Sequence, residues 1–417
     1  MLSRKPGNSR LTPELIEVTV SHRLLIAALF FGGFVANMNN VAIVPYLSPI
    51  ASDIESSVPL VGQAQMAGLI IGAVVGLFVG PLSDHYGLRR VLIFGGATMA
   101  LCGFGTALAF DYWILLLARI PGGLAFGMIM GLGASIATNH LPEMQRRSAL
   151  GWMVSGSAIA VIIGAPVLAF IGDQLSWRIG FAIVGAFGIL LIPAYILALP
   201  PDLPADSGTL DLRKFFSGYR EILSDRRMFG LQSATIIWGA SWTGLNTYLG
   251  AFAVDSVGVS LGDFGYLFMV GGIFFLFGSQ SAPYLCRFWT PRWVMLPVAG
   301  LLFVSCVLYF TVPTGFLHIA LIFAPLGFAG GAGLPLMAIL VSDATKVRPG
   351  SVMMLRQFCY GFGSGAGAAL GGLFLSISGY TLLAFGLGTF ALLSFLVVIL
   401  SSRAVMSDQP EPAVGGE

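Results

Sequence analysis

The chain contains twelve apolar stretches of about 20 residues, and this pattern limits the possible folds more than any other feature of the sequence. An α-helix of this length crosses the hydrocarbon core of a bilayer. Because every backbone N–H and C=O in that core must be paired within the protein, helices are the expected elements. We expect them at 22–47, 59–80, 91–110, 113–137, 149–172, 178–199, 229–253, 261–283, 292–312, 316–341, 351–376 and 379–401.

The composition supports an all-α polytopic membrane protein. Apolar residues make up 56% of the chain and charged residues 10%, whereas about a quarter of a typical soluble domain is charged. The basic residues form no cluster, so no nucleic-acid partner is expected. The four cysteines, at positions 102, 286, 306 and 359, have no metal-ligand spacing, and we expect free thiols.

The basic residues also predict the orientation of the chain. When alternate loops are assigned to one side, eighteen of the 21 Lys and Arg residues share the side of the termini, and only Arg178 lies on the other. Because cytoplasmic loops carry an excess of Lys and Arg, both termini are expected to be cytoplasmic.

One long polar segment interrupts the apolar pattern. It opens with two prolines, which end the preceding helix. We therefore expect a cytoplasmic N-terminal tail (1–21), a six-helix bundle (22–199), a cytoplasmic linker (200–228), a second six-helix bundle (229–401) and a cytoplasmic tail (402–417). Apolar residues recur at helical spacing within the linker, which predicts either an amphipathic helix on the inner leaflet or a plain solvated linker.

A short polar stretch, residues 80–90, lies between the second and third apolar runs. Gly80 and Gly87 allow two helices to turn tightly and approach each other. Asp84 is a carboxylate at the membrane edge, and Arg89 and Arg90 mark that edge as cytoplasmic. We interpret these five residues as a conformational gate between the cytoplasmic ends of the bundles.

The stretch resembles the signature of the loop between helices 2 and 3 in the major facilitator superfamily: glycine, three residues, aspartate, two residues, glycine, then basic residues. His85 and Leu88 stand where the family usually has arginine. The resemblance implies a secondary transporter of twelve helices in two six-helix bundles, which works by alternating access.

The two halves of the sequence also resemble each other. Residues 81–90 correspond to 283–292 at an offset of 202, and residues 121–123 correspond to 325–327 at an offset of 204. The alternative is chance similarity between glycine-rich apolar helices. A 6+6 repeat predicts a binding site near the midplane, between the bundles.

The apolar runs hold no carboxylate and no histidine away from their ends. An intramembrane enzyme or metal site would need a cluster of such residues, so we expect no enzyme activity, no metal and no cofactor. The runs do hold two arginines, and an arginine at membrane depth is a functional candidate. Arg119 lies about six residues inside its helix, or roughly 9 Å. Arg356 lies five residues inside another, from where its side chain could reach the inner interface.

The surroundings of Arg119, residues 116–123, resemble the superfamily's helix 4 motif of arginine, three residues, then glycine, in which the arginine serves the transport cycle. A structural pair, or a side chain that reaches along the helix to the membrane interface, is the alternative for Arg119. The fifth helix and its end, with Gly156, Gly164, Pro166 and Trp177, resemble the bacterial drug and sugar efflux branch of the family. Ala165 separates the glycine and proline that are adjacent in that branch.

Seven more residues lie on helices expected to face the space between the bundles. They are Asn37 and Asn40 on the first helix, Trp238, Trp242 and Asn246 on the seventh, and Gln357 and Tyr360 on the eleventh. Together with Arg119 and Arg356 they are the candidate substrate-binding residues. Contacts between helices are the alternative role for the seven. Gln63 and Gln65 are expected at the outer rim.

The sequence thus predicts a monomeric secondary active transporter of the bacterial inner membrane, which exports a small organic solute or drug. One alternative is an organic-anion exchanger or uniporter that uses Arg119 and Arg356 as counter-charges, and another is a lipid flippase on the same fold. Protons are a candidate coupling ion, but without an intramembrane carboxylate we expect weak or no dependence on a proton gradient.

Overall fold

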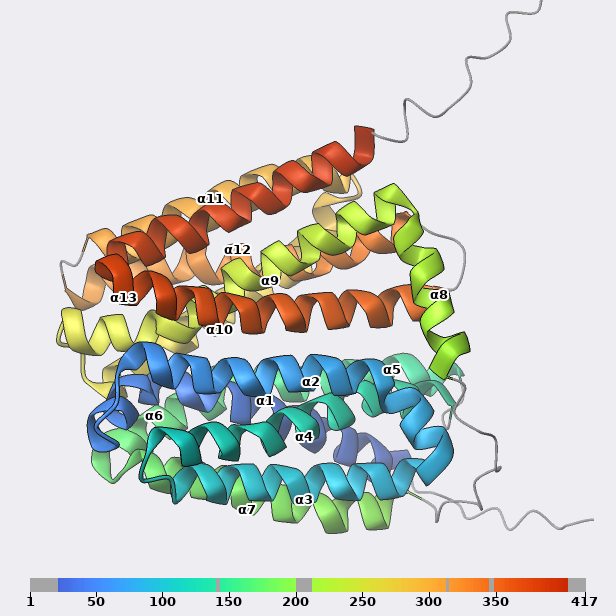
Figure 1. Cartoon of the computed structure of the whole chain (residues 1–417), viewed down its shortest axis with the longest axis horizontal. Helices are drawn as coiled ribbons and strands as arrows, with labels where there is room; N and C mark the ends of the chain where they lie inside the picture. The colour runs from blue at the N-terminus through green and yellow to red at the C-terminus, as the bar shows by residue number, and fades with distance from the viewer. Residues whose placement is uncertain (1–21, 140–142, 200–211, 313–314, 345–348, 404–417) are drawn as a thin grey trace, which may run out of the picture.

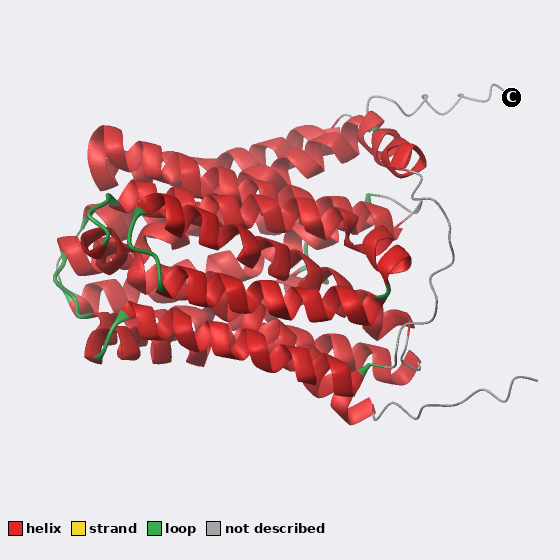
Figure 2. Ribbon diagram, turned by 60° about the horizontal axis from the view of Figure 1, so that its bottom comes forward, coloured by secondary structure: helices red, strands yellow, loops and turns green. Residues whose placement is uncertain are grey.

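The computed structural model describes residues 22–139, 143–199, 212–312, 315–344 and 349–403. Every secondary-structure element within these ranges is a helix (Figure 2). The expected tails and most of the first half of the linker lie outside the described residues.

The first half of the chain forms one bundle. Its helices are α1 (His22–Asp53), α2 (Val58–Tyr86), α3 (Leu88–Ala107), α4 (Tyr112–Asn139), α5 (Glu143–Ile159), η1 (Ala160–Gly164), α6 (Ala165–Gln174) and α7 (Trp177–Ala198). Together α5, η1 and α6 fill the place of the single helix expected at 149–172. The segment η1 is one turn of π-helix within that longer helix.

The second half forms the other bundle. It contains α8 (Leu212–Ser224), α9 (Arg226–Ala251), η2 (Phe252–Ser256), α10 (Leu261–Leu285), α11 (Pro291–Thr311), α12 (Phe316–Asp343) and α13 (Pro349–Arg403). The long α13 is interrupted at Ser378 and Gly379, and Gly379 has φ 68°. The interruption coincides with the predicted boundary between the last two apolar runs, so α13 consists of two helices.

Each of the twelve predicted apolar runs is helical in the structure. Ten of the described helices are long and apolar enough to cross a membrane, with the two parts of α13 counted as one. Helix α9 is not among the ten. It has 26 residues but is less apolar than the other long helices of its half, because it carries several polar side chains. The number of crossings and the side of the termini remain predictions.

Figure 1 shows the two halves of the chain as two bundles lying side by side. The most extensive contacts between them join α2 to α13, α10 to α6 and η1, and α1 to α9. We call the two ends of the molecule the Asp53 end, where α1 meets α2, and the Asp84 end, where α2 meets α3.

The turn at the Asp84 end is shorter than predicted. We expected helices to end at residue 80 and resume at 91, but α2 continues to Tyr86 and α3 begins at Leu88. Pro81 lies inside α2, since a membrane helix tolerates the loss of one backbone hydrogen bond. The whole turn is Gly87, with φ 92° and ψ 140°, a conformation open only to glycine. Gly80 is therefore part of a helix.

The internal repeat is visible in the helix crossings. A Cβ atom at Gly123 of α4 would overlap the carbonyl oxygen of Gly68 in α2, and one at Gly327 of α12 would overlap that of Gly271 in α10. The two crossings are related by offsets of 203 and 204 residues, close to those found in the sequence. Small residues at such crossings allow two backbones to pack closely.

The linker helix α8 packs on protein. The buried ring of Tyr219 joins a separate apolar cluster with Leu77 of α2 and with Leu355 and Cys359 of α13, which we call the linker cluster. Figure 1 shows α8 at the Asp84 end, alongside the second bundle, with one end at the edge of the first. Burial also raises the pKa of the Tyr219 hydroxyl. The linker is therefore helical from Leu212, and at Tyr219 it covers the junction of α2 and α13.

Candidate substrate-binding site

Arg119 lies in the interior of the first bundle. Its side chain is 1% exposed. Nη1 donates to Oδ1 of Asn39 at 3.1 Å, and Nη2 donates to the Asn39 carbonyl at 3.3 Å and to Oε1 of Gln65 at 2.6 Å. The guanidinium also lies over the Phe181 ring, 5.6 Å from its centroid. Arg119, Asn39, Gln65 and the neighbouring Cys102 thiol, 3.8 Å from Nη1, form what we call the Arg119 cluster.

Every hydrogen-bond acceptor in this cluster is neutral. In the part of the chain that the structure describes, no carboxylate lies within ion-pair distance of Arg119. Gln65 is 3% exposed, so its predicted place at the outer rim was wrong. A buried arginine needs acceptors, and those on α1 and α2 are the nearest available. Asn39 was not among the predicted site residues, although it stands next to Asn40 in a run of three asparagines within four positions.

The second bundle has no equivalent of this cluster. The repeat places Phe323 at the position of Arg119, Leu245 at that of Asn39 and Phe268 at that of Gln65, and all three are buried. The same helix arrangement therefore packs with an apolar core. The fold itself therefore does not require a charge at this position, and the role of Arg119 stays a prediction.

Two of the predicted residues on α1 are partly exposed. Asn37 donates to Oγ of Ser157 in α5 at 2.8 Å and to the carbonyl of Gly33 at 3.2 Å. Asn40 has no hydrogen bond with any described residue. Helices α2, α4, α5, α7, α9 and α10 all contact α1. Asn40 is therefore a partly exposed amide, with no partner among the described residues, on a helix that six others contact.

The three predicted residues on α9 have different surroundings. Trp238 is fully buried, and a Cβ atom at Gly333 of α12 would overlap its ring, so in this conformation Trp238 fills a helix contact. Trp242 is partly exposed and stacks on Phe275 of α10, with ring centroids 5.7 Å apart. Asn246 is also partly exposed and donates to the Trp242 carbonyl at 2.9 Å.

A row of hydroxyl groups joins α9 to α13. Thr243 donates to Ser364 at 2.8 Å, and its hydroxyl lies 3.5 Å from that of Tyr360. Neither Thr243 nor Ser364 was singled out in the sequence, because single hydroxyls in apolar runs are common. One turn from Tyr360, partly buried Arg356 contacts Oε1 of exposed Gln357 at 3.4 Å, and its Nε has no hydrogen-bond partner among the described residues.

The predicted gate residues lie at the Asp84 end. Asp84 is exposed and makes no hydrogen bond or ion pair with a described residue. Arg89 donates to the carbonyl of Ile196 at 2.9 Å, in the last turn of α7, where free carbonyls and the helix dipole favour a cation. Gly80 is close to the other bundle, since a Cβ atom there would lie 4.0 Å from the Met354 methyl group. Arg90 is exposed.

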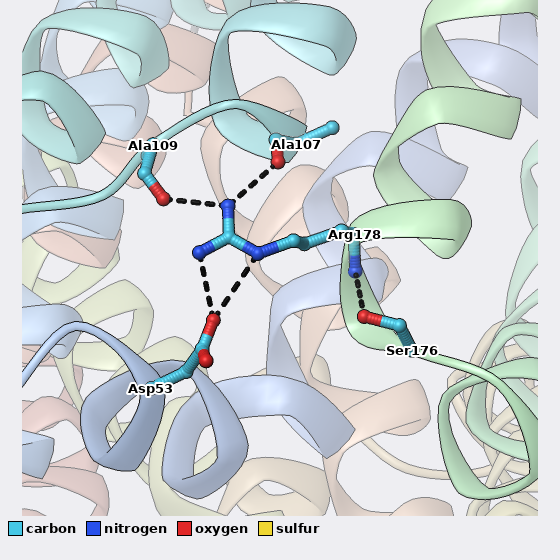
Figure 3. Close-up of polar contacts among 5 residues, drawn as sticks. All are labelled: Asp53, Ala107, Ala109, Ser176 and Arg178. Carbon is cyan, nitrogen blue, oxygen red and sulfur yellow. Dashed lines mark hydrogen bonds and ion pairs between the residues drawn. The ribbon is translucent and has the colours of Figure 1, made fainter.

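At the Asp53 end, Arg178 ties three helices of the first bundle together (Figure 3). Its guanidinium makes an ion pair with Asp53 of α1 at 2.7 Å. It also donates to the carbonyl of Ala107, the last residue of α3, at 2.8 Å and to that of Ala109 at 2.7 Å. It also stacks on Trp177, 4.4 Å from the ring centroid. Because these partners occupy the whole guanidinium, Arg178 is not a free ligand-binding cation.

One polar contact at this end crosses between the bundles. Ser48 of α1 donates to Oδ2 of Asp255 in η2 at 2.6 Å. Nearby, a Cβ atom at Gly250 of α9 would overlap the Val44 carbonyl of α1. The bundles are therefore in direct contact here. No group of three or more His, Cys, Asp or Glu side chains suited to a metal ion is found among the described residues.

Two solved transporters share this architecture. A bacterial homologue of the human lysosomal transporter Spinster, in an inward-facing and unoccupied conformation, superimposes with a TM-score of 0.72 at 17% identity, over 94% of this chain and 99% of its own. The nucleoside transporter NupG superimposes with a TM-score of 0.73 at 15% identity, over 93% and 99%. At these identities the likeness shows the fold alone.

Relatives in sequence support the same assignment. The inner membrane transport protein YdhP of Escherichia coli K12 is 25% identical over 395 residues, which is 93% of this chain and 97% of YdhP. The "Probable sugar efflux transporter" of Helicobacter pylori 26695 is 32% identical over 178 residues, or 42% of this chain and 45% of that protein. The model of the Major Facilitator Superfamily matches residues 29–324. This chain therefore belongs to the Major Facilitator Superfamily, as a multi-pass inner-membrane transport protein of its efflux branch.

Proposed function

We propose that the protein exports a small neutral organic solute, with sugars and sugar alcohols as the first class to test. A relative that matches nearly half of the chain is named as a sugar efflux transporter. The features of the fifth helix that resemble efflux proteins agree with this direction.

The chemistry of the partly exposed interior residues carries the proposal. Asn40, Asn246, Thr243 and Tyr360 present amides and hydroxyls, which both donate and accept hydrogen bonds. Trp242 presents a ring face beside them. A neutral hydroxylated solute matches such groups, because each of its hydroxyls also both donates and accepts.

Alternating access is the mechanism that the arrangement favours. The Ser48 to Asp255 hydrogen bond and the Val44 to Gly250 contact join the bundles at the Asp53 end. At the other end Asp84 is unpaired with any described residue. We infer that Asp84, with the one-residue turn at Gly87, contacts the second bundle only when the Asp84 end closes, and so acts as a gate that favours one state.

An organic anion is the second candidate substrate, because two cations lie in the helices without carboxylate partners. Arg119 is buried among neutral acceptors, and Arg356 is partly exposed with its Nε unbonded. Both leave positive potential that an anion would reduce. Arg356 is the better contact residue, since Arg119 is inaccessible in this conformation.

Counterflow into proteoliposomes tests both candidates. We expect vesicles loaded with unlabelled D-glucose or D-mannitol to accumulate the labelled compound, while D-gluconate, which has the glucose skeleton plus a carboxylate, accumulates less. Vesicles without protein are the control. Gluconate uptake well above that of both neutral compounds would favour the anion carrier, and counterflow of none of the three would contradict the proposed substrate class.

A further inference from the structure

The same type of helix crossing occurs once in each bundle. In the first bundle, α1 passes α5 so closely that a Cβ atom at Gly33 would overlap the carbonyl of Met153. In the second, α9 passes α13 so that a Cβ atom at Gly239 would overlap the carbonyl of Tyr360. The helix pairs are related by offsets of 206 for α1 to α9 and 207 for α5 to α13. This register gives every residue of α1 and α5 a partner position in the other bundle.

The same register relates two hydrogen bonds. Asn37 donates to Ser157 at 2.8 Å, and at the equivalent positions Thr243 donates to Ser364 at 2.8 Å. Both bonds join the inner helix of a bundle to the helix that crosses it. Each leaves capacity unused, since an amide has a carbonyl oxygen and a hydroxyl has lone pairs beyond those engaged.

The register also relates two partly exposed amides. Asn40 of α1 corresponds to Asn246 of α9, about one turn beyond Asn37 and Thr243. One further turn along, Val44 and Gly250 are equivalent too, and these two touch each other. Because equivalent residues meet there, α1 and α9 cross at the axis that relates the bundles. The two asparagines therefore lie one helical turn before that crossing, on opposite sides of the axis.

Neighbouring positions show that this agreement is not general. Asn39 is matched by Leu245, and Ala36 by Trp242. Polar character is kept in both bundles at three pairs of equivalent positions, 37/243, 157/364 and 40/246, while the buried Asn39 is matched by an apolar residue. Helix packing alone does not require polar residues at equivalent positions, because the second bundle packs apolar residues at the positions equivalent to the Arg119 cluster.

We propose that Asn37, Asn40, Ser157, Thr243, Asn246 and Ser364, the paired set, form one ligand site on the axis between the bundles, for a neutral polyhydroxylated ligand. The inference rests on the proposed function and adds Ser157 and Ser364, which bond to Asn37 and Thr243, to the site. Each bundle supplies one partly exposed amide and one hydrogen-bonded pair, so a ligand with hydroxyls at both ends can bond to both halves. Asn40 has no partner among the described residues, whereas Asn246 donates to the Trp242 carbonyl and keeps its own amide oxygen as an acceptor. Neither half carries a charge in the set, which disfavours a carboxylate.

Binding to the purified protein in nanodiscs tests this inference separately from transport. Radiolabelled D-mannitol and D-glucose are the probes, and D-gluconate is the charged comparison. Asn40→Ala and Asn246→Ala should each weaken binding of the neutral probes by about two- to tenfold, the range for one neutral hydrogen bond. Ser157→Ala and Ser364→Ala should give smaller losses that again match each other, because these residues position Asn37 and Thr243.

Matched controls come from the same helices. Ser155 of α5 and Ser376 of α13 are exposed and donate to their own backbone, so Ser155→Ala and Ser376→Ala should leave binding unchanged. Asn40→Ser and Asn246→Ser replace the alanine variants if either fails to fold. A loss confined to one bundle, losses equal to those of the controls, or gluconate bound more tightly than glucose would overturn the site. Neutral probes bound without counterflow would support the site and contradict export.

Discussion

Replacing the Arg119 cluster with its counterpart from the second bundle should separate stability from transport. The variant Arg119→Phe, Asn39→Leu, Gln65→Phe copies the apolar residues found at positions 323, 245 and 268. It removes a buried cation together with its two side-chain acceptors, so no polar group of the three is left unpaired. Such exchanges are often neutral or stabilising, and we expect a change in unfolding free energy within about 1.5 kcal/mol.

Partial changes should cost more than the complete exchange. Gln65→Leu alone takes the acceptor at 2.6 Å from the guanidinium, and a hydrogen bond to a charged group contributes about 1.5–3 kcal/mol. Arg119→Ala leaves a cavity and leaves the amides of Asn39 and Gln65 without their donor. Truncating so large a side chain should lower the free energy of unfolding by about 3–5 kcal/mol, and the loss of a buried charge should offset part of this. Arg119→Lys should restore only part of the network, since lysine lacks the planar fork.

The assay is unfolding in SDS titrations alongside counterflow of the wild-type substrate. We expect the triple variant to unfold near the wild-type midpoint and to lose transport by at least about tenfold, a barrier change of about 1.4 kcal/mol. Near wild-type transport by the triple variant would refute a transport role for Arg119. Unfolding as early as in Arg119→Ala would refute the equivalence of the two cores.

Three further predictions concern the gate, the linker and coupling. Asp84→Asn should slow transport and raise thiol labelling of a Ser351→Cys reporter, because the variant lacks the about 0.3–1 kcal/mol of attraction between the carboxylate and the start of α13. Unchanged labelling together with a large loss of substrate affinity would place Asp84 in the binding site. In a protein whose other cysteines are replaced by serine, Tyr219→Ala should speed thiol labelling of Cys359, which is 4% exposed, by roughly tenfold, since about 1.4 kcal/mol of lost packing shifts local opening by that factor. The control Leu223→Ala, on the exposed side of α8, should leave the labelling rate unchanged. Equal rates in both variants would argue against the linker cluster as a cover of Cys359. Substrate movement should carry few or no protons, and stoichiometric acidification measured with an internal pH dye would contradict this.

The helices were predictable from the sequence because one physical constraint, the thickness of the bilayer, determines their length. The residues at which the helices end were less predictable. Gly80 and Pro81 suggested a helix end, but α2 runs on to Tyr86, since backbone pairing outweighs a single proline. The break at Ser378 and Gly379 was predicted to within a few residues because glycine interrupts the apolar pattern there.

The candidate site was predictable in part. Asn40, Trp242 and Tyr360 are partly exposed, and their place in a substrate site stays a prediction. Trp238 is inaccessible in this conformation, because helical spacing gives the face of a residue but not the size of the neighbour, here Gly333. Thr243 is recognised only once the crossing of α9 and α13 fixes the register of the two halves.

The position of α8 has a consequence for how the protein folds during its synthesis. The chain is made from its N-terminus, and at about 5–20 residues per second roughly 7 to 27 s pass between the synthesis of Tyr219 and that of Leu355. During that interval Leu77 has no partner from α13, and Tyr219 is the first member of the linker cluster to follow it. We infer that α8 shields the first bundle until the second is inserted. A nascent chain stalled after α8 should then resist proteolysis at the end of α2, and Tyr219→Ala should remove that resistance.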